Sequence, residues 1–360
     1  RIEDLETGAL LERTHILRDS GDAGNVWVNI EPSFNQIHIP LASSAELRIR
    51  ENSSIRGCVD VCYKLRLPMG VEKDKKRRSS NYREVDIVST ISLERDAKTL
   101  KFKTTVNNIV EDHKLSVLFP TGIAADKSHS DGSFEIVERP IDYTTDRNGR
   151  TGDEILCHPM QKFIDISDGK RGVALMSKGI HEYRTDVIDG KSVVELTLLR
   201  AVTQTFPIHG DVFIEFDENP AQSQGEQTFE YALNFHAGDY LEGDVMKTAY
   251  CYVVPPAVYQ HAPGTNRGML PLSHSFIEKS NDAVTLHAVK KEECGDGIII
   301  RLCNPSPKMQ RERLTLHHRC DRVWLCLADE RELSEVGIKD GVVELDIAPY
   351  KIVTIKVRPC

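Results

Sequence analysis

The chain lacks the features of several large protein classes. Its 360 residues contain no run of about 18 consecutive apolar residues, so no membrane-spanning helix is predicted. Basic side chains are not in surplus, because 46 Lys and Arg stand against 55 Asp and Glu and the net charge is −9. This balance excludes a generally basic nucleic-acid binder, and the basic run at residues 73–78 is predicted to be a solvated loop.

The cysteines show no Cys-x-x-Cys pair, and their odd number, nine, suits neither a disulfide framework nor a regular metal site. We therefore expect mostly reduced thiols and a cytoplasmic protein. The cluster His317-His318-Arg319-Cys320 could ligate zinc, or its polar residues could simply end a strand. The chain starts at Arg1 with neither an initiator Met nor a signal-peptide pattern, so we expect it to be part of a longer polypeptide.

Self-contained catalytic motifs are missing as well. There is no Gly-x-Ser-x-Gly elbow, no Gly-rich phosphate loop and no His-Glu-x-x-His. Paired carboxylates could perform glycosidic acid/base chemistry, but the 55 acidic residues are too many for the sequence to single out a pair. Glu215 and Asp217 share one strand face, which a polar edge row explains equally well.

Short strand patterns are abundant. Runs rich in β-branched residues occur at 193–199, 212–216, 297–302, 322–327 and 342–347, with Asp-Gly turns between several of them. Residues 230–235 alternate with period two, which would place Tyr231, Leu233 and Phe235 on one face. Helical periodicity is weak, and the best candidate is a single turn from Ser44 to Arg48. The pattern predicts an all-β protein built from sandwiches.

Two stretches interrupt the strand pattern. Residues 122–160 are polar and glycine-bearing, and we expect a poorly structured segment that is functional or packs against another part of the molecule. Residues 254–272 are proline-rich and are predicted to connect two domains. We place these domains at residues 1–265 and 266–360.

Two features suggest a site. The stretch Asp19-Ser20-Gly21-Asp22-Ala23-Gly24-Asn25 has the composition of a calcium loop but lacks the acidic twelfth position of an EF-hand. The alternative is a rigid turn, in which Gly21 and Gly24 adopt positive φ and the Asp side chains accept bonds from backbone N–H groups. Arg200 ends an apolar strand, from which it could bind a polyol or carboxylate or form a salt bridge at the sheet margin.

Five segments then point to a family. They lie in order at residues 17–27, 106–121, 134–140, 161–200 and 222–233. The first contains Asp-Ser-Gly-Asp-Ala-Gly-Asn-Val-Trp and the second Glu-Asp-His-Lys-Leu followed by Leu-Phe-Pro-Thr. Together they resemble the region that follows the catalytic barrel in glycoside hydrolase family 38, the retaining α-mannosidases. The tail at 299–306 resembles the terminal sandwich of bacterial members, which include mannosylglycerate hydrolases.

The resemblance implies a large β super-sandwich over residues 1–265 and a smaller β-sandwich over 266–360. It implies a full-length enzyme that hydrolyses α-mannosides with retention and uses zinc, and that could form a homodimer. The nucleophile, the acid/base and the zinc ligands would belong to the N-terminal catalytic barrel of the same polypeptide. We therefore expect this chain to contain no catalytic residue, to bind no metal and to contribute the wall of the sugar cleft.

The resemblance also assigns residues. Arg200 matches an Arg that reaches the sugar, and Trp27 replaces a Tyr, so that stacking on a sugar face would substitute for a hydroxyl contact. Four further residues are expected to be structural or to support the site: Asp19, Asp22, Asp112 and His113. Lys114 and Ser116 stand where the family usually has Arg.

Two rival functions remain open from the sequence. A stand-alone carbohydrate-binding sandwich would bind sugar through exposed aromatics such as Trp27, Tyr183 or Trp324. A purely structural scaffold would use Arg200 for stability alone.

Overall fold

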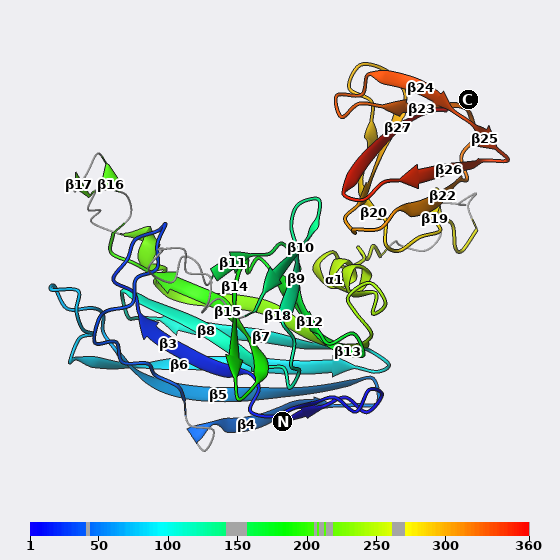
Figure 1. Ribbon diagram of the computed structural model, residues 1–360. Coiled ribbons are helices and arrows are strands. Elements are labelled where there is room, and N and C mark those ends of the chain that lie inside the picture. The colour runs from blue at the N-terminus through cyan, green and yellow to red at the C-terminus, as the bar shows by residue number, and fades with distance from the viewer. Residues whose placement is uncertain are drawn as a thin grey trace. The chain divides into compact units, whose positions relative to one another are not determined.

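The computed structural model describes residues 1–40, 44–141, 157–204, 207–208, 212–213, 219–260 and 271–359. Antiparallel strands dominate, as predicted, and they form two compact units (Figure 1). The first unit comprises Arg1–Ser130 and Glu138–Val245, and the second comprises Asp131–Val137 and Met246–Cys360. Each unit is built around a pair of larger sheets. The predicted boundary at residue 265 lies outside the described residues.

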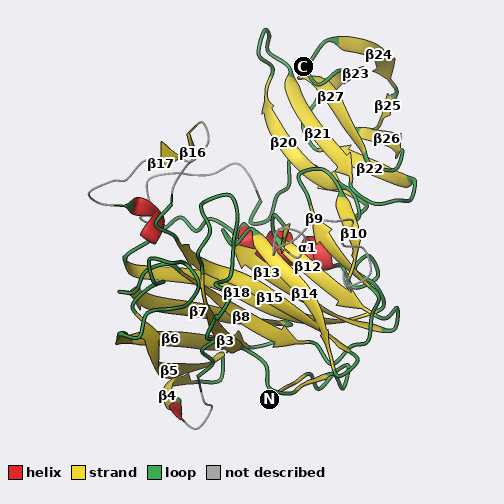
Figure 2. Ribbon diagram, turned by 60° about the vertical axis from the view of Figure 1, so that its left-hand side comes forward, coloured by secondary structure: helices red, strands yellow, loops and turns green. Residues whose placement is uncertain are grey.

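The first unit pairs a sheet of nine strands with a sheet of five (Figure 2). The larger sheet has the order β10-β9-β12-β13-β18-β7-β6-β5-β4, and the smaller has the order β11-β14-β15-β8-β3. The strands of the larger sheet are β4 (Glu46–Asn52), β5 (Arg56–Pro68), β6 (Tyr82–Glu94), β7 (Thr99–Asn108), β9 (Lys127–Asp131), β10 (Ile136–Pro140), β12 (Phe163–Ser167), β13 (Arg171–Lys178) and β18 (Gly225–Ala237). Those of the smaller sheet are β3 (Ile16–Gly21), β8 (His113–Pro120), β11 (Cys157–Pro159), β14 (Glu182–Ile188) and β15 (Lys191–Ala201). Short pairs complete the unit: β1 (Ile2–Glu3) with β2 (Leu10–Leu11), and β16 (Pro207–Ile208) with β17 (Val212–Phe213).

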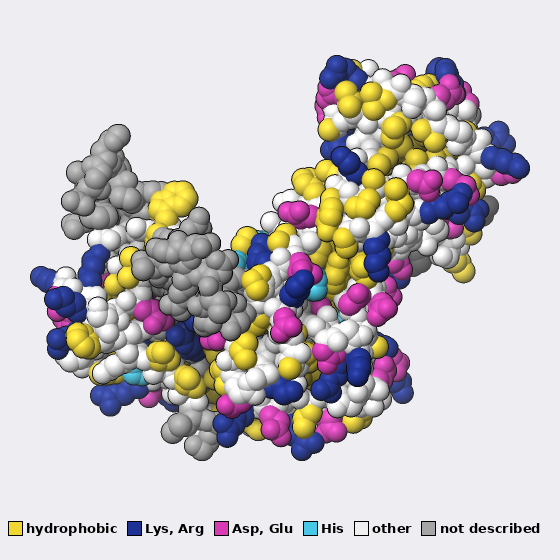
Figure 3. Space-filling view, in the orientation of Figure 1, with side chains coloured by type: hydrophobic (Ala, Val, Ile, Leu, Met, Phe, Trp, Pro, Cys, Tyr) yellow, Lys and Arg dark blue, Asp and Glu magenta, His cyan; other side chains and the backbone are white. Residues whose placement is uncertain are grey.

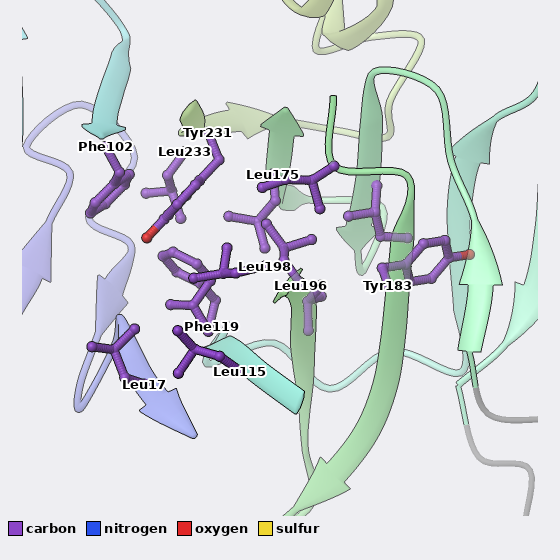
Figure 4. Close-up of a cluster of buried hydrophobic side chains, with 14 of the residues drawn as sticks. Leu17, Phe102, Leu115, Phe119, Leu175, Tyr183, Leu196, Leu198, Tyr231 and Leu233 are labelled. Atoms are coloured by element: carbon purple, nitrogen blue, oxygen red, sulfur yellow. The ribbon is translucent and has the colours of Figure 1, made fainter. Parts of the chain in front are cut away.

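The core of this unit fills the space between the two sheets (Figure 4). The predicted alternation in β18 is confirmed, because Tyr231 and Leu233 are fully buried there and Phe235 packs against the same cluster. Aliphatic side chains of β8 and β15 meet them from the opposite sheet, among them Leu115 and Leu196. Burying one such side chain contributes about 1.5–3 kcal/mol, so this core fixes which face of β3, β8 and β15 points outward.

A buried histidine lies in this core. His15 stacks on Phe102 at a centroid distance of 5.0 Å, and its Nε2 lies 2.8 Å from the Tyr231 hydroxyl. A chain of hydroxyls continues through Thr104 to Ser89. Burial lowers the pKa of His15 to about 4, since a charged ring is poorly solvated there.

This pKa predicts acid sensitivity. Between pH 6.5 and 4 the unfolded chain binds a proton at His15 that the folded chain does not, so stability falls as pH falls through this window. The loss amounts to about 3 kcal/mol at pH 4. His158, whose pKa burial also lowers to about 4, acts in the same direction. His15→Asn, which suits the positive φ of this residue, should weaken the pH dependence of the unfolding free energy measured in urea. An unchanged pH dependence would contradict this prediction.

The second unit is smaller and has its own core. One sheet has the order β19-β22-β26-β25 and the other β20-β21-β27-β23-β24. Their strands are β19 (Ile277–Lys279), β20 (Thr285–Lys291), β21 (Ile298–Asn304), β22 (Gln310–Leu316), β23 (Cys320–Cys326), β24 (Glu332–Val336), β25 (Ile338–Lys339), β26 (Val342–Ile347) and β27 (Lys351–Pro359). The predicted strands at 297–302, 322–327 and 342–347 are confirmed within a few residues.

The local structure differs from expectation in three places. The proposed helical turn ending at Arg48 is largely the start of β4, because its alternating charged and apolar residues suit an edge strand. A helix that the sequence did not reveal, α1 (Val245–Val253), follows β18, and none of the described helices could span a membrane. Residues 122–141 are also better ordered than expected: they include β9 and β10, whereas 142–156 lie outside the described residues.

The surface bears charges of both signs. On the face seen in Figure 3, basic and acidic side chains are interspersed. Residues 73–77 are exposed, as predicted for a solvated loop. Arg78 departs from that prediction, because its side chain is fully buried against the carboxylate of Asp19.

Candidate functional site

The candidate site lies on the outer face of the five-stranded sheet, where β3, β8 and β15 are neighbours. Leu199 and Ala201 are buried, and the alternation of the strand places Arg200 between them on the outer face. The strand register sets Arg200 opposite Lys114 and Lys114 opposite Ser20. A row of polar side chains therefore crosses three strands at their ends.

The guanidinium of Arg200 is held in one orientation. Its Nε donates to Asp22 Oδ2 at 2.9 Å, and its Nη2 lies 2.7 Å from the same oxygen and donates to the Asn25 carbonyl at 2.9 Å. Asp22 is itself fixed, since its Oδ1 accepts bonds from the backbone N–H groups of Gly24 and Ile30. Arg200 Nη1 has no partner among the described residues, so one edge of a rigid cation remains available to a ligand.

Asp22 shows that the turn interpretation of residues 19–25 is right in part. Its bonds to backbone N–H groups are those expected of a rigid turn, and its remaining oxygen, Oδ2, binds the guanidinium of Arg200. The role given to the glycines is wrong, because neither Gly21 nor Gly24 has positive φ. They are needed for close approach: a Cβ at Gly21 would lie 2.9 Å from Arg78 Cγ, and one at Gly24 would overlap the Val28 carbonyl.

A buried charge cluster supports this turn. Asp19 Oδ2 lies 2.6 Å from His113 Nδ1, and Asp19 Oδ1 lies 2.6 Å from Arg78 Nη2. All three side chains are at most 1% exposed. Burial alone would raise the pKa of Asp19, but the charges and hydrogen bonds of His113 and Arg78 outweigh burial and lower it.

The second nitrogen of His113 is also engaged. Its Nε2 lies 3.0 Å from Asn108 Oδ1. The amide of Asn108 is oriented by its Nδ2, which donates to the carbonyls of Gln222 and Ser223. The ring of His113 is therefore held between the carboxylate of Asp19 and the amide of Asn108.

Asp112 joins this support to the site. Its carboxylate accepts bonds from the N–H and hydroxyl of Thr203 and from the amide of Gln222. Its backbone carbonyl accepts the N–H of Asp22 at 2.9 Å. An open recess of about 190 Å³ borders the two aspartates, lined also by Gly24, Thr203 and others. Asp112 therefore braces the residue that orients Arg200.

Trp27 lies at the tip of the same loop. The side chain of Asn25 accepts the N–H groups of Trp27 and Val28, which makes a tight turn. The carbonyl of Asn25 is the one that binds Arg200. Trp27 is 73% exposed. A broad apolar ring therefore projects from the loop whose residues Asp22 and Asn25 fix the guanidinium of Arg200.

The sequence did not indicate the role of Lys114. This lysine is nearly buried, and its Nζ donates to Glu182 Oε1 at 3.0 Å. Burial acts to lower the pKa of Lys114, but Cys157, Glu182 and Glu195 outweigh it, so the pKa is raised. The pKa of Glu182 is lowered, because Lys114 and Thr197 outweigh the opposing effect of burial.

The carboxylates of the candidate site are all engaged by hydrogen bonds or ion pairs. Asp19, Asp22, Asp112 and Glu182 each bind a cation, a hydroxyl or backbone N–H groups. Within the described ranges no group of three or more His, Cys, Asp or Glu could hold a metal ion. The arrangement can orient a ligand through a fixed cation and an aromatic ring. It does not itself present a nucleophile with a matching acid.

The other sequence candidates are buried, paired or outside the described residues. Tyr183 is fully buried and Trp324 is nearly so, which leaves Trp27 as the exposed one of the three aromatics suggested for a sugar-binding module. His317 pairs with Glu278 in the turn between β22 and β23, as the strand-end interpretation expects. Glu215 and Asp217 lie outside the described residues.

Comparison with known proteins identifies the two units. The family model described as "Glycosyl hydrolases family 38 C-terminal domain" matches residues 3–208. A second, described as "Glycosyl hydrolases family 38 C-terminal beta sandwich domain", matches residues 283–355. The first match alone covers more than half of the chain.

Individual relatives agree. A protein of Halalkalibacterium halodurans named "Putative mannosylglycerate hydrolase" is 28% identical over 372 aligned residues, which cover 99% of this chain and 39% of that protein. An alpha-mannosidase structure from Enterococcus faecalis V583 has the same fold, with a TM-score of 0.83 at 24% identity, over 98% of this chain and 40% of that one. A second family 38 structure from Enterococcus faecalis gives 0.81 at 24% identity, over 98% and 41%. The chain thus spans about two fifths of these relatives, and it belongs to glycoside hydrolase family 38, whose C-terminal region it represents.

Proposed function

We propose that this chain is the C-terminal part of a retaining α-mannosidase and forms one wall of its sugar site. The observation that carries the proposal is the fixed guanidinium of Arg200. Asp22 and Asn25 hold it in one orientation near the end of β15, and its Nη1 remains available to a ligand. Trp27, two residues after the Asn25 whose carbonyl binds Arg200, is exposed. A planar donor and an aromatic face are the usual means of holding a hydroxylated ring in place.

In this proposal the bond-breaking groups lie on the N-terminal part of the full-length protein. Retention needs two carboxyl groups about 5–5.5 Å apart, one as nucleophile and one as acid/base. The site carboxylates of this chain are already engaged, which supports placing that pair elsewhere. The described residues also do not fit a zinc site. Zinc bound by the N-terminal part would stabilise charge on the sugar oxygens.

The full-length protein provides the test. We expect it to hydrolyse an aryl α-mannoside, to release the α-anomer first in an NMR time course, and to lose activity on chelation until zinc returns. Mannosylglycerate belongs in the same assay, because the Halalkalibacterium halodurans relative carries that name. Release of the β-anomer first, or no hydrolysis of either substrate, would contradict the proposal.

Trp27 gives a prediction about the cleft wall. Trp27→Ala in the full-length protein should lower kcat/KM by about five- to tenfold, mainly through KM, since a stacking contact contributes about 1 kcal/mol. The Tm should not move, because the indole is mostly exposed. Trp27→Phe should recover much of the loss. An unchanged KM would remove Trp27 from the site.

Two further properties belong to the proposal. We place the protein in the cytoplasm, a location that the odd number of cysteines and the absence of a Cys-x-x-Cys pair in the sequence support. We also propose a homodimer of the full-length protein, which light scattering over a range of concentrations would test.

A further inference from the structure

The basic run at residues 73–78 forms the tip of a tight hairpin in the structure. The backbone N–H of Glu72 donates to the Arg77 carbonyl at 2.9 Å, and that of Lys75 donates to the Glu72 carbonyl at 2.8 Å. The side chain of Asp74 accepts the N–H of Lys76 at 2.9 Å, as in a tight turn. The exposed charges of this run therefore lie on a backbone of defined shape.

Two contacts fix this hairpin to the candidate site. Arg78, at the base of the hairpin, is buried in an ion pair with Asp19. On the other side of the hairpin, the Met69 carbonyl accepts the backbone N–H of Glu111 at 3.0 Å, and Glu111 directly precedes Asp112. Segments of the site itself thus set the position of the hairpin.

The recess of about 190 Å³ lies between the hairpin and the site. Lys73 and Lys75 line it from the hairpin, and Asp22 and Asp112 line it from the site. Both aspartates are already engaged by the partners described above. The recess is smaller than the roughly 300–1,000 Å³ of a pocket that encloses a drug-sized ligand, so it suits a short polar group.

The two lysines supply positive charge that is not used elsewhere. Neither ammonium group forms an ion pair or a hydrogen bond with the part of the chain that the structure describes. Glu72 also lines the recess without such a partner, so two cations stand against one anion among the unpaired lining groups. Ammonium groups bind carboxylates through charge-assisted hydrogen bonds. The recess can therefore bind a small carboxylate between Lys73 and Lys75.

We propose that the recess binds a carboxylate on the leaving group of the substrate, held by Lys73 and Lys75. This inference rests on the proposed function. Asp22 lines the recess and also orients Arg200, so a leaving group in the recess would adjoin a sugar held by Arg200. The Halalkalibacterium halodurans relative carries the name of such a substrate, since the glycerate of mannosylglycerate is a short carboxylic acid.

Kinetics of the full-length protein on two matched substrates test the recess. Mannosylglycerate and its primary amide have nearly the same size and differ in negative charge. We expect kcat/KM to be about tenfold higher for the acid than for the amide, the effect of one hydrogen bond to a charged group. In the double variant Lys73→Gln/Lys75→Gln the ratio of the two kcat/KM values should fall to about one.

Lys76→Gln is the matched control. Lys76 is exposed on the same hairpin but does not line the recess, so its loss removes a nearby positive charge without removing a ligand. The ratio should stay at about tenfold in this variant. The Tm of the double variant and of the control should match that of the native protein, because all three lysines are exposed.

An aryl α-mannoside separates this inference from the proposed function. If the full-length protein hydrolysed it but did not prefer the acid to the amide, the recess would not bind a carboxylate and the proposed function would stand. A preference for the acid that survived in the double variant, or that Lys76→Gln abolished, would also overturn the inference. Hydrolysis of none of the three substrates would overturn the proposed function and this inference with it.

Discussion

Arg200→Lys in the full-length protein is expected to lower kcat/KM for an aryl α-mannoside by about 100-fold, the order found when a fixed donor is lost from an oxyanion site. Lysine keeps a positive charge near the buried carboxylate of Asp22, so the fold should survive. Arg200 uses Nε and Nη2 to bind Asp22 and Asn25 and keeps Nη1 for the substrate. Lysine has a single side-chain nitrogen and cannot do both. Steady-state kinetics and thermal unfolding measure the two effects.

Arg301→Lys is the matched control for this substitution. Arg301 also lies on a strand, with Nε bonded to Thr354 and Nη2 to the Ala328 carbonyl, but it belongs to the second unit. It should leave kcat/KM unchanged. If Arg200→Lys lowered the Tm while kcat/KM stayed at the native value, Arg200 would be part of a scaffold and not of the sugar site.

Asp19→Asn is expected to cause the largest loss of stability. The substitution leaves Arg78 and His113 buried without their shared anion, and breaking a buried pair in this way costs about 3–5 kcal/mol. For a unit of this size the Tm should fall by about 10 °C. Calorimetry of the 360-residue chain checks the shift.

Glu46→Gln provides the comparison on the surface. Glu46 pairs with Arg48 through two hydrogen bonds of 2.8 Å, but both side chains are exposed and the pair is screened by solvent. Its Tm should match that of the native chain. A Tm for Asp19→Asn within 2 °C of native would show that the cluster does not hold the turn in place.

The strands were predictable from the sequence because their signal is local. Apolar alternation such as that of Tyr231 and Leu233 follows from the pleat, and it identifies the buried face without knowledge of the partner strand. The helix Val245–Val253 was missed because it is only nine residues long and has no acidic residue in its first turn and no basic residue in its last turn. Its buried residues, Val245, Ala249 and Tyr252, have helical spacing that is too short to stand out.

The site was only partly predictable, because its contacts join distant parts of the chain. Arg200 and Asp22 were both singled out, but their bond spans 178 residues and no spacing rule reveals it. Arg78 was predicted to lie in a solvated loop, because it directly follows the five charged residues 73–77, which are exposed. Nothing in the sequence of this run marks Arg78 as the one side chain that is buried. Gly24 was predicted to adopt positive φ. It is needed instead because a Cβ would overlap the Val28 carbonyl, and only the three-dimensional structure reveals that contact.

The central claim is a division of labour between this chain and the polypeptide that accompanies it in its relatives. The most direct test assays the 360-residue chain and the full-length protein side by side on an aryl α-mannoside, with and without added zinc. We predict zinc-dependent hydrolysis by the full-length protein and none by the chain alone. Turnover by the isolated chain would contradict the account, because its site carboxylates would then have to perform the chemistry for which we find them already engaged.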